Sequence, residues 1–264
     1  MPFEVFKAAL SKLPDKTTRC VTFFWRGEPT LDRRLPGWGR IAQERGFYTY
    51  TSTNTATPLL HNENYVSTLL DSFDRICFCV DGYDQESVNR YRVGTDWDTL
   101  LLNLETISSF ETKCRKEMRV LMFRYNESHI QRFIDMAKRY KMDSLRFGLP
   151  IINGNRVLGE EEAEMWLAED RKYQRYTKHD EGWVHRGGRT CNPLPIISVT
   201  GEVAPCCYDW QLNHPIGNIL HDSKTQINRK YVKVSRLAKR YKLSMCQSDC
   251  FVPTFKVNVP VKLR

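Results

Sequence analysis

Apolar residues in the first 151 positions form two alternating kinds of segment. Short runs rich in β-branched and aromatic residues predict five strands, at 20–25, 47–54, 75–82, 118–126 and 144–151. Segments with apolar residues at helical spacing predict five helices, at 2–14, 34–46, 62–73, 97–110 and 127–141. The pattern therefore predicts a chain that opens on a helix and continues as repeated strand–helix units.

The order of these units predicts an α/β fold with a parallel sheet. Most of the predicted strands are near-continuous apolar runs, such as ICFCV at 76–80, which is typical of strands buried on both faces. Five such strands with helices outside them form a partial (β/α) barrel or an open sheet. In either geometry the ligand site lies at the carboxyl ends of the strands. The segments at those ends are GEP at 27–29, TSTN at 51–54, VDG at 80–82 and RYN at 124–126.

The strand–helix pattern ends near residue 152, which suggests three parts. We expect residues 1–152 to form the partial barrel and residues 153–190 to form a bridge with an acidic helix and a loop. Residues 191–264 would form a small cysteine-rich domain. Within it, IISV, a turn around Thr200 and Gly201, and EVAP predict a β-hairpin, because glycine supplies the positive φ that a tight turn often needs.

The cysteines and the chain start indicate a reducing compartment. The chain has nine cysteines, an odd number, and its first residues do not resemble a secretory signal. No apolar run approaches the roughly 18 residues that a membrane span needs. We therefore expect a cytoplasmic protein with reduced thiols and no membrane association.

The net charge of +9 has its source in the C-terminal segment. Residues 224–264 hold 11 of the 40 Lys and Arg residues but a single acid, Asp249. Such a segment can bind nucleic acid or an anionic substrate, but a solvated helix face is the commoner reason for it. Nucleic acid is therefore the less favoured partner.

Four cysteines of the C-terminal domain can share one site. If the hairpin turns at Gly201, the loop that carries Cys191 approaches Cys206, whereas Cys207 points to the opposite face of its strand. Cys246 and Cys250 lie one helical turn apart in CQSDC. Four thiolates hold either zinc or an iron–sulfur cluster, and their spacing alone does not choose between them. The alternative is that these cysteines are ordinary small buried residues.

The motif around the hairpin is specific to one kind of domain. Cys191, Gly201 and Cys206, followed by PIGNI at 215–219 and a late cysteine pair, resemble the auxiliary-cluster module of radical S-adenosylmethionine (SAM) enzymes, of the SPASM or twitch type. The resemblance implies one auxiliary 4Fe-4S cluster on Cys191, Cys206, Cys246 and Cys250. A cluster with four thiolates carries a net charge of about −2, which the basic tail could offset.

The predicted strand ends resemble the same family in the expected order. Gly27, Glu28 and Pro29 match the GEP motif that lines the pocket for the methionyl amino group of SAM. Thr53 and Asn54 match the end of the next strand, at the cofactor rim. Asp81 and Arg92 match the fourth strand and the segment after it, and would face the pocket.

One family element is missing. Radical SAM chemistry needs three cysteines with three and two residues between them, and the 264 residues contain no such triplet. The one Cys-x-x-x-Cys is CQSDC, and Pro253 stands where the third cysteine would be. We expect the first βα unit to be missing, through an internal start, a second polypeptide that supplies it, or loss in a remnant. We favour the first or the last, and expect that this chain alone does not cleave SAM.

The resemblance implies a function class, and the residues leave one alternative open. Complete relatives abstract hydrogen from a peptide, a sugar or another small metabolite, and a small electron-transfer protein is an expected partner. No catalytic residue can be assigned. The alternative is a non-catalytic module with four-cysteine zinc and a basic C-terminus that binds nucleic acid or another anionic partner.

Overall fold

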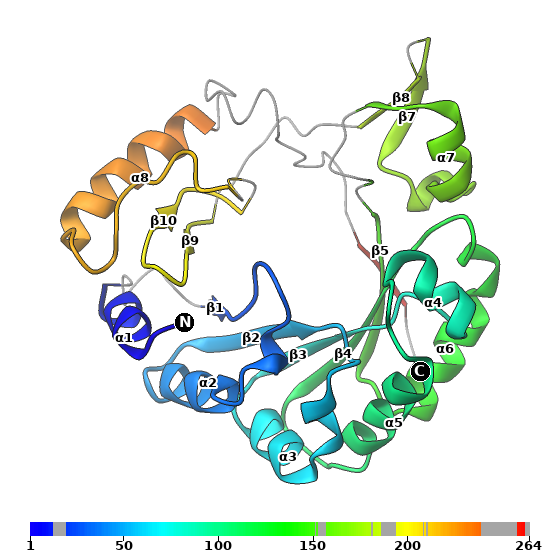
Figure 1. The fold of residues 1–264 in the computed structure, drawn as a ribbon, viewed down its shortest axis with the longest axis horizontal. Helices are drawn as coiled ribbons and strands as arrows, with labels where there is room; N and C mark the ends of the chain where they lie inside the picture. Colours follow the sequence, from blue (N-terminus) through cyan, green and yellow to red (C-terminus); the bar gives the residue numbers. More distant parts are fainter. Residues whose placement is uncertain are drawn as a thin grey trace. The chain divides into compact units, whose positions relative to one another are not determined.

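A curved six-stranded sheet is the largest feature of the computed structural model (Figure 1). The structure describes residues 1–12, 20–150, 152, 157–180, 182–185, 194–207, 209, 211–238 and 258–261. Five strands of this sheet are parallel and follow the chain order: β1 (Cys20–Thr22), β2 (Tyr48–Thr53), β3 (Arg75–Cys79), β4 (Arg115–Leu121) and β5 (Ser144–Gly148). The predicted α/β fold with about five parallel strands is confirmed.

Helices cover the outer face of the sheet, as Figure 1 shows. They are α2 (Leu35–Glu44), α3 (Glu63–Asp71), α4 (Gln85–Tyr91), α5 (Trp97–Ser108) and α6 (Ile130–Arg139). Four of these overlap the predicted helical segments, whereas the sequence pattern did not predict α4. Short 3-10 turns follow three strand ends, at Pro29–Leu31, Pro58–His61 and Glu127–His129.

The two faces of the sheet differ in polarity. Side chains toward the helices are fully buried and mostly apolar, for example Ile76, Phe78, Met118, Val120 and Phe147. The opposite face, which lines the inside of the curve, carries Tyr50, Ser52, Cys77, Cys79 and a group of charged side chains. The composition of the strands suggested that both faces are buried in apolar surroundings. The structure shows that only one face is. Side chains alternate along a strand, so one face can be apolar while the other is polar.

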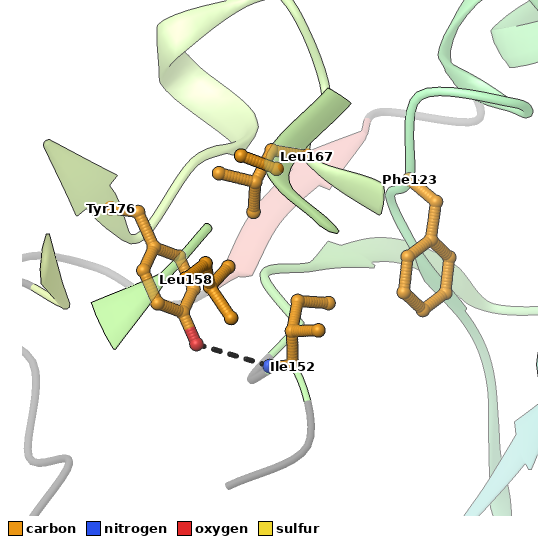
Figure 2. Packing of buried hydrophobic residues seen from close by; sticks show 6 residues of the cluster. Phe123, Ile152, Leu158, Leu167 and Tyr176 are labelled. Carbon is orange, nitrogen blue, oxygen red and sulfur yellow. Dashed lines mark hydrogen bonds between the residues drawn. The ribbon is translucent and has the colours of Figure 1, made fainter. Parts of the chain in front are cut away.

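A smaller sheet and helix follow the barrel strands. Strands β6 (Val157–Leu158), β7 (Tyr176–His179) and β8 (Gly182–His185) form a sheet in the order β6-β8-β7, next to α7 (Glu160–Trp166). The core here contains Phe123, Ile152, Leu158, Ala163, Leu167 and Tyr176. Figure 2 shows this cluster, with the amide of Ile152 donating to the Tyr176 hydroxyl at 3.1 Å. This buried hydrogen bond ties the end of the parallel strands to β7.

A second compact unit contains the predicted hairpin. The chain divides into one unit of 19–152, 157–183 and 256–264, and another of 1–18, 153–156 and 184–255. The second unit holds α1 (Phe3–Lys12), β9 (Ile196–Ile197), β10 (Val203–Ala204) and α8 (Lys224–Ala238). Val5 and Ala9 of α1 lie in one buried cluster with Val203, Ile216 and Ile219. The N-terminal helix thus packs with the hairpin unit, whereas the sequence pattern placed it with the barrel.

One strand has no counterpart in the sequence prediction. Strand β11 (Asn258–Val261) pairs antiparallel with β5, and places Asn258 opposite Gly148 and Val261 opposite Leu145. It closes the far edge of the sheet with a segment from the basic C-terminus. None of the helices in the described part of the chain is long and apolar enough to cross a membrane.

Candidate functional site

The turn after β1 is organised by the carboxylate of Glu28. Its Oε1 accepts hydrogen bonds from the Thr30 amide at 3.0 Å and the Thr30 hydroxyl at 2.7 Å, and its Oε2 accepts from the Asn54 amide at 2.6 Å. Gly27 has a φ of 79°, which favours glycine because it has no Cβ. Pro29 begins the 3-10 turn with a fixed φ. Both carboxylate oxygens are used within the protein, so Glu28 positions the backbone of this turn.

A network of hydroxyl groups continues from this turn to the end of β2. The Thr30 hydroxyl lies 3.1 Å from that of Thr53 and 2.7 Å from that of Thr57, and all three residues are buried. Sequence reasoning found Thr53 but missed Thr30 and Thr57. Each of these two threonines lies next to a proline at the start of a turn. This pattern is too common to indicate a site by itself.

Asn103 of α5 supports the segment that follows β2. Its Nδ2 donates to the carbonyls of Thr55 at 2.8 Å and Thr57 at 3.1 Å, and its side chain is fully buried. The Thr55 hydroxyl in turn donates to the carbonyl of Cys79 at the end of β3, at 3.2 Å. Thr55 has a φ of 67°, an uncommon value for a β-branched residue, and these contacts hold it there.

Asp81 and Arg92 form a buried ion pair just beyond β3. Asp81 Oδ2 accepts from Arg92 Nε at 2.6 Å and lies 2.5 Å from Arg92 Nη2, and Asp81 Oδ1 accepts from the Leu121 amide at 2.7 Å. The Asp81 side chain is 1% exposed and that of Arg92 is 22% exposed. Asp81 therefore joins the ends of β3 and β4, and fixes the direction of a guanidinium group that still reaches solvent.

The carboxyl ends of the first four strands form one connected rim. The Phe23 amide after β1 donates to the Tyr50 carbonyl of β2 at 2.8 Å, and Glu28 binds Asn54 as described. Thr55 binds the last residue of β3, and Asp81 binds the last residue of β4. The structure thus places Gly27, Glu28, Pro29, Thr53, Asn54, Asp81 and Arg92 along a single edge of the sheet. This edge is where parallel sheets bind ligands.

The hairpin of the second unit has the geometry expected from its sequence. Ile197 lies opposite Val203 and Ile196 opposite Ala204, so the strands turn around Gly201, whose φ is 92°. The PIGNI segment adds to it, because the Val203 amide donates to the Gly217 carbonyl and the Ile216 amide to the Val203 carbonyl, both at 2.8 Å. A Cβ on Gly201 would lie 2.9 Å from Asn218 Oδ1, so the turn and PIGNI require the glycine.

The loop after the hairpin carries Cys206. Cys206 is buried at 7% exposure, whereas the next residue, Cys207, is exposed. Asp209, also buried, organises this loop by accepting from the amides of Asn213 at 2.9 Å and His214 at 3.0 Å. A thiol held inside an ordered loop is suited to ligate a metal centre. The thiol donor suits iron and zinc equally well.

The remaining predicted ligands cannot be placed. Cys191, Cys246 and Cys250 lie outside the described residues. Among the residues that are described, no group of three or more His, Cys, Asp and Glu could hold a metal ion.

Four other cysteines lie in the unit that contains the parallel sheet. Cys77 and Cys79 are buried with their sulfurs 4.0 Å apart, and the hydrogen bond between them raises the pKa of Cys77 and lowers that of Cys79. Burial raises the pKa of Cys114 to about 12, so this thiol stays protonated at neutral pH. Cys20 is exposed at the start of β1, although burial of part of its surface raises its pKa.

Part of the second unit matches a known protein family. Residues 194–251 match the family model of SPASM, an iron-sulfur cluster-binding domain. The match includes Cys206, Cys246 and Cys250 and begins three residues after Cys191. No curated protein matches the chain in sequence.

Two proteins solved with bound S-adenosylmethionine have a similar fold. SuiB of Streptococcus suis, solved bound to S-adenosylmethionine, aligns with a TM-score of 0.62 and 15% identity, covering 97% of this chain and 65% of that one. The enzyme anSMEcpe, solved with AdoMet and the Cp18Cys peptide, aligns with a TM-score of 0.60 and 15% identity, covering 97% of this chain and 84% of that one.

Other solved relatives are matched over a shorter share of their length. For a TYW1 structure with a lysine-pyruvate adduct the alignment has a TM-score of 0.45 and 17% identity, and covers 66% of this chain and 59% of that one. The chain therefore spans less than two thirds of that protein. The chain thus shares its fold with SuiB and anSMEcpe, and its residues 194–251 match the SPASM iron-sulfur cluster-binding domain.

Proposed function

We propose that this protein binds one auxiliary 4Fe-4S cluster in its SPASM domain, with Cys191, Cys206, Cys246 and Cys250 as the thiolate ligands. The observation that carries the proposal is the position of Cys206: it is buried in an ordered loop at the end of the hairpin, inside the segment that matches the iron-sulfur domain. Four thiolates form a complete ligand set for such a cluster. When bound, a cluster with this complete ligand set would supply a one-electron acceptor.

Cys206 is the preferred ligand over its neighbour. Successive side chains at a strand end point in opposite directions, and here Cys206 is buried while Cys207 is exposed. A cluster held by a buried sulfur is shielded from water, and Asp209, close to Cys206 in the chain, is itself held by the amides of Asn213 and His214. The basic tail from Lys224 onward would balance the negative charge of the thiolate cluster.

The rim of the sheet is proposed as a binding site for SAM. The backbone of Gly27 to Pro29, held by Glu28, would receive the methionyl amino group, and Thr53 and Asn54 would line the same edge. Arg92 offers a guanidinium group to a carboxylate or hydroxyl of the cofactor, because Asp81 occupies only one side of its fork. This arrangement binds and orients a ligand, and it assigns no proton transfer.

The chain by itself is proposed not to cleave SAM. The sequence has no cysteine triplet with spacings of three and two residues, and CQSDC lacks the third member. Cleavage would need a cluster with an open iron site that this chain does not ligate. A peptide or a small molecule is the proposed substrate class, supported by the peptide bound to anSMEcpe. A small electron-transfer protein is the proposed partner.

Metal analysis after anaerobic purification tests the proposal. We expect about four irons and four sulfides per chain, with broad visible absorption, and no zinc above trace level. Zinc in place of iron would contradict the proposal and favour a structural zinc module. Incubation with SAM and a strong reductant should yield no 5′-deoxyadenosine, and its formation at a rate above that of a cluster-free control would refute the proposed inactivity.

A further inference from the structure

An excess of arginine lines the inner face of the barrel sheet, below the rim described above. Arg75 on β3, Arg119 on β4 and Arg146 on β5 are half-buried on this face. The carboxylate that lies among them belongs to Glu117, whose side chain is 4% exposed. Asp81, nearer the rim, is already paired with Arg92. Three cations and one anion therefore share a surface that is partly withdrawn from water, where an uncompensated charge is costly.

Glu117 compensates two of the three arginines. Its Oε2 lies 2.8 Å from Arg146 Nε and 3.9 Å from Arg75 Nη1. The guanidinium of Arg75 also stacks over the Tyr50 ring, 4.0 Å from its centroid. Arg75 and Arg146 thus each have a carboxylate partner, although the Nε of Arg75 has no hydrogen-bond partner among the described residues.

Arg119 forms no ion pair with a carboxylate among the described residues. Its Nε is buried without a hydrogen-bond partner among the described residues. The register of the sheet places it directly opposite Arg146 on one side and Cys79 on the other. Like charges directly opposite each other in a sheet are destabilising. Arg119 is thus the position on this face where an anion would bring the largest gain.

The backbone next to Arg119 is shaped to hold its side chain. A Cβ on Gly148 would lie 3.0 Å from Arg119 Nε and 3.3 Å from Arg119 Nη2, and 2.8 Å from Leu121 Cδ2. The guanidinium therefore lies over Gly148, in space that any other residue would fill. Because Leu121 ends β4 and its amide binds Asp81, Arg119 lies just below the rim.

We propose that Arg119 binds an oxyanion of the substrate, a carboxylate or a phosphate, that enters the barrel from the rim, with Arg146 as a second cation beside it. A guanidinium offers two parallel N–H donors, which match either group. The proposal rests on the proposed function only in placing the substrate inside the barrel. It narrows the substrate class to molecules or peptides that carry such a group.

Binding of two simple anions tests this proposal on the full chain. Inorganic phosphate and succinate are titrated calorimetrically at constant ionic strength set by chloride, so that general screening stays fixed. We expect at least one of them to bind, and which one binds identifies the oxyanion. Arg119→Gln should weaken that binding about tenfold or more, whereas Arg115→Gln, which removes the exposed arginine at the start of the same strand, should change it by less than about twofold.

Two further variants keep the test decisive. Arg119→Gln should leave the ligand-free protein as stable as the parent or more stable in urea, because Arg119 forms no ion pair that the substitution would break. A clear loss of stability in this variant would instead indicate a purely structural role for the arginine. Gly148→Ala should weaken anion binding by displacing the guanidinium. Binding of neither anion, or equal binding by the Arg119 and Arg115 variants, would overturn the proposal. Cys206→Ser should retain anion binding, so failure of the cluster assignment would not be mistaken for failure of this one.

Discussion

The carboxylate of Asp81 meets the guanidinium of Arg92 at 2.6 Å from Nε and at 2.5 Å from Nη2, with the aspartate almost completely shielded from water. The two residues are eleven positions apart in the chain, with helix α4 between them, so the pair closes the loop that follows β3. The second aspartate oxygen holds the Leu121 amide. The Asp81 side chain thus fixes the loop after β3, the end of β4 and the guanidinium of Arg92 at the proposed cofactor rim.

Asp81→Asn should be strongly destabilising. It leaves the charge of Arg92 uncompensated in a half-buried position, and removing one partner of a buried pair typically costs about 3–5 kcal/mol. Urea unfolding measures the loss. Glu86→Gln breaks the exposed pair of Glu86 and Arg90, whose atoms lie 2.9 Å apart, and should cost less than about 1 kcal/mol. Equal effects of the two variants would contradict the structural role given to Asp81.

Two glycines of α2 should respond oppositely to alanine. A Cβ on Gly39 would lie 2.3 Å from the Ser72 carbonyl oxygen and 2.7 Å from the Phe73 ring, so α2 packs on the end of α3 through this position. Gly39→Ala should destabilise by about 1–3 kcal/mol through overpacking. Nothing lies within 4 Å of a Cβ on Gly37, and Gly37→Ala should stabilise by up to about 1 kcal/mol through helix propensity. Thermal unfolding of both variants distinguishes these signs.

The N-terminal helix α1 should contribute to the stability of the hairpin unit. Lys12 Nζ donates to the carbonyls of Ile219 at 2.5 Å and Asp222 at 2.7 Å, both in the segment after the hairpin. Lys12→Met should cost about 1–2 kcal/mol, since charged hydrogen bonds are lost and two carbonyls lose their donor. Lys7→Met, at an exposed site of the same helix, should stay within about 0.5 kcal/mol. Urea unfolding followed by fluorescence provides the comparison, and an unaffected Lys12 variant would contradict the packing of α1.

The turn of the hairpin should be sensitive to acid. The Ser198 and Thr200 hydroxyls donate to the Glu202 carboxylate and hold its pKa below the usual value. Because the folded pKa is the lower one, this contribution is complete above the unfolded value of about 4.3 and is lost as pH falls through the folded value. The melting temperature of the parent should fall more steeply than that of Glu202→Gln between about pH 5 and pH 3. Parallel pH profiles would show that the carboxylate does not support the turn.

The sequence pattern predicted the sheet because parallel strands and their helices have strong local signals. Each predicted strand has a counterpart, and the rim residues follow from the rule that carboxyl ends share one edge. The hairpin was equally predictable, since Gly201 marks the turn and the register follows from it. These features depend on residues that are close together in the chain.

Features that depend on distant segments were not predictable. The pairing of β11 with β5 and the packing of α1 on the hairpin unit join residues more than 100 positions apart, for which one sequence gives no signal. The sequence does contain one sign of the charged inner face. Arg115, Glu117 and Arg119 occupy alternate positions of β4, which places them on the same face of the strand. The predicted strand began at residue 118, so Arg115 and Glu117 lay outside it and the alternation was not recognised.

The iron content of two neighbouring cysteine variants tests the central claim most directly. Cys206→Ser and Cys207→Ser are purified anaerobically beside the parent, and iron is measured per folded chain. The account predicts that Cys207→Ser retains about four irons per chain, as the parent does, and that Cys206→Ser loses most of them while the sheet keeps its far-ultraviolet circular dichroism. Retention of iron in the Cys206 variant with loss in the Cys207 variant, or full retention in both, would contradict it.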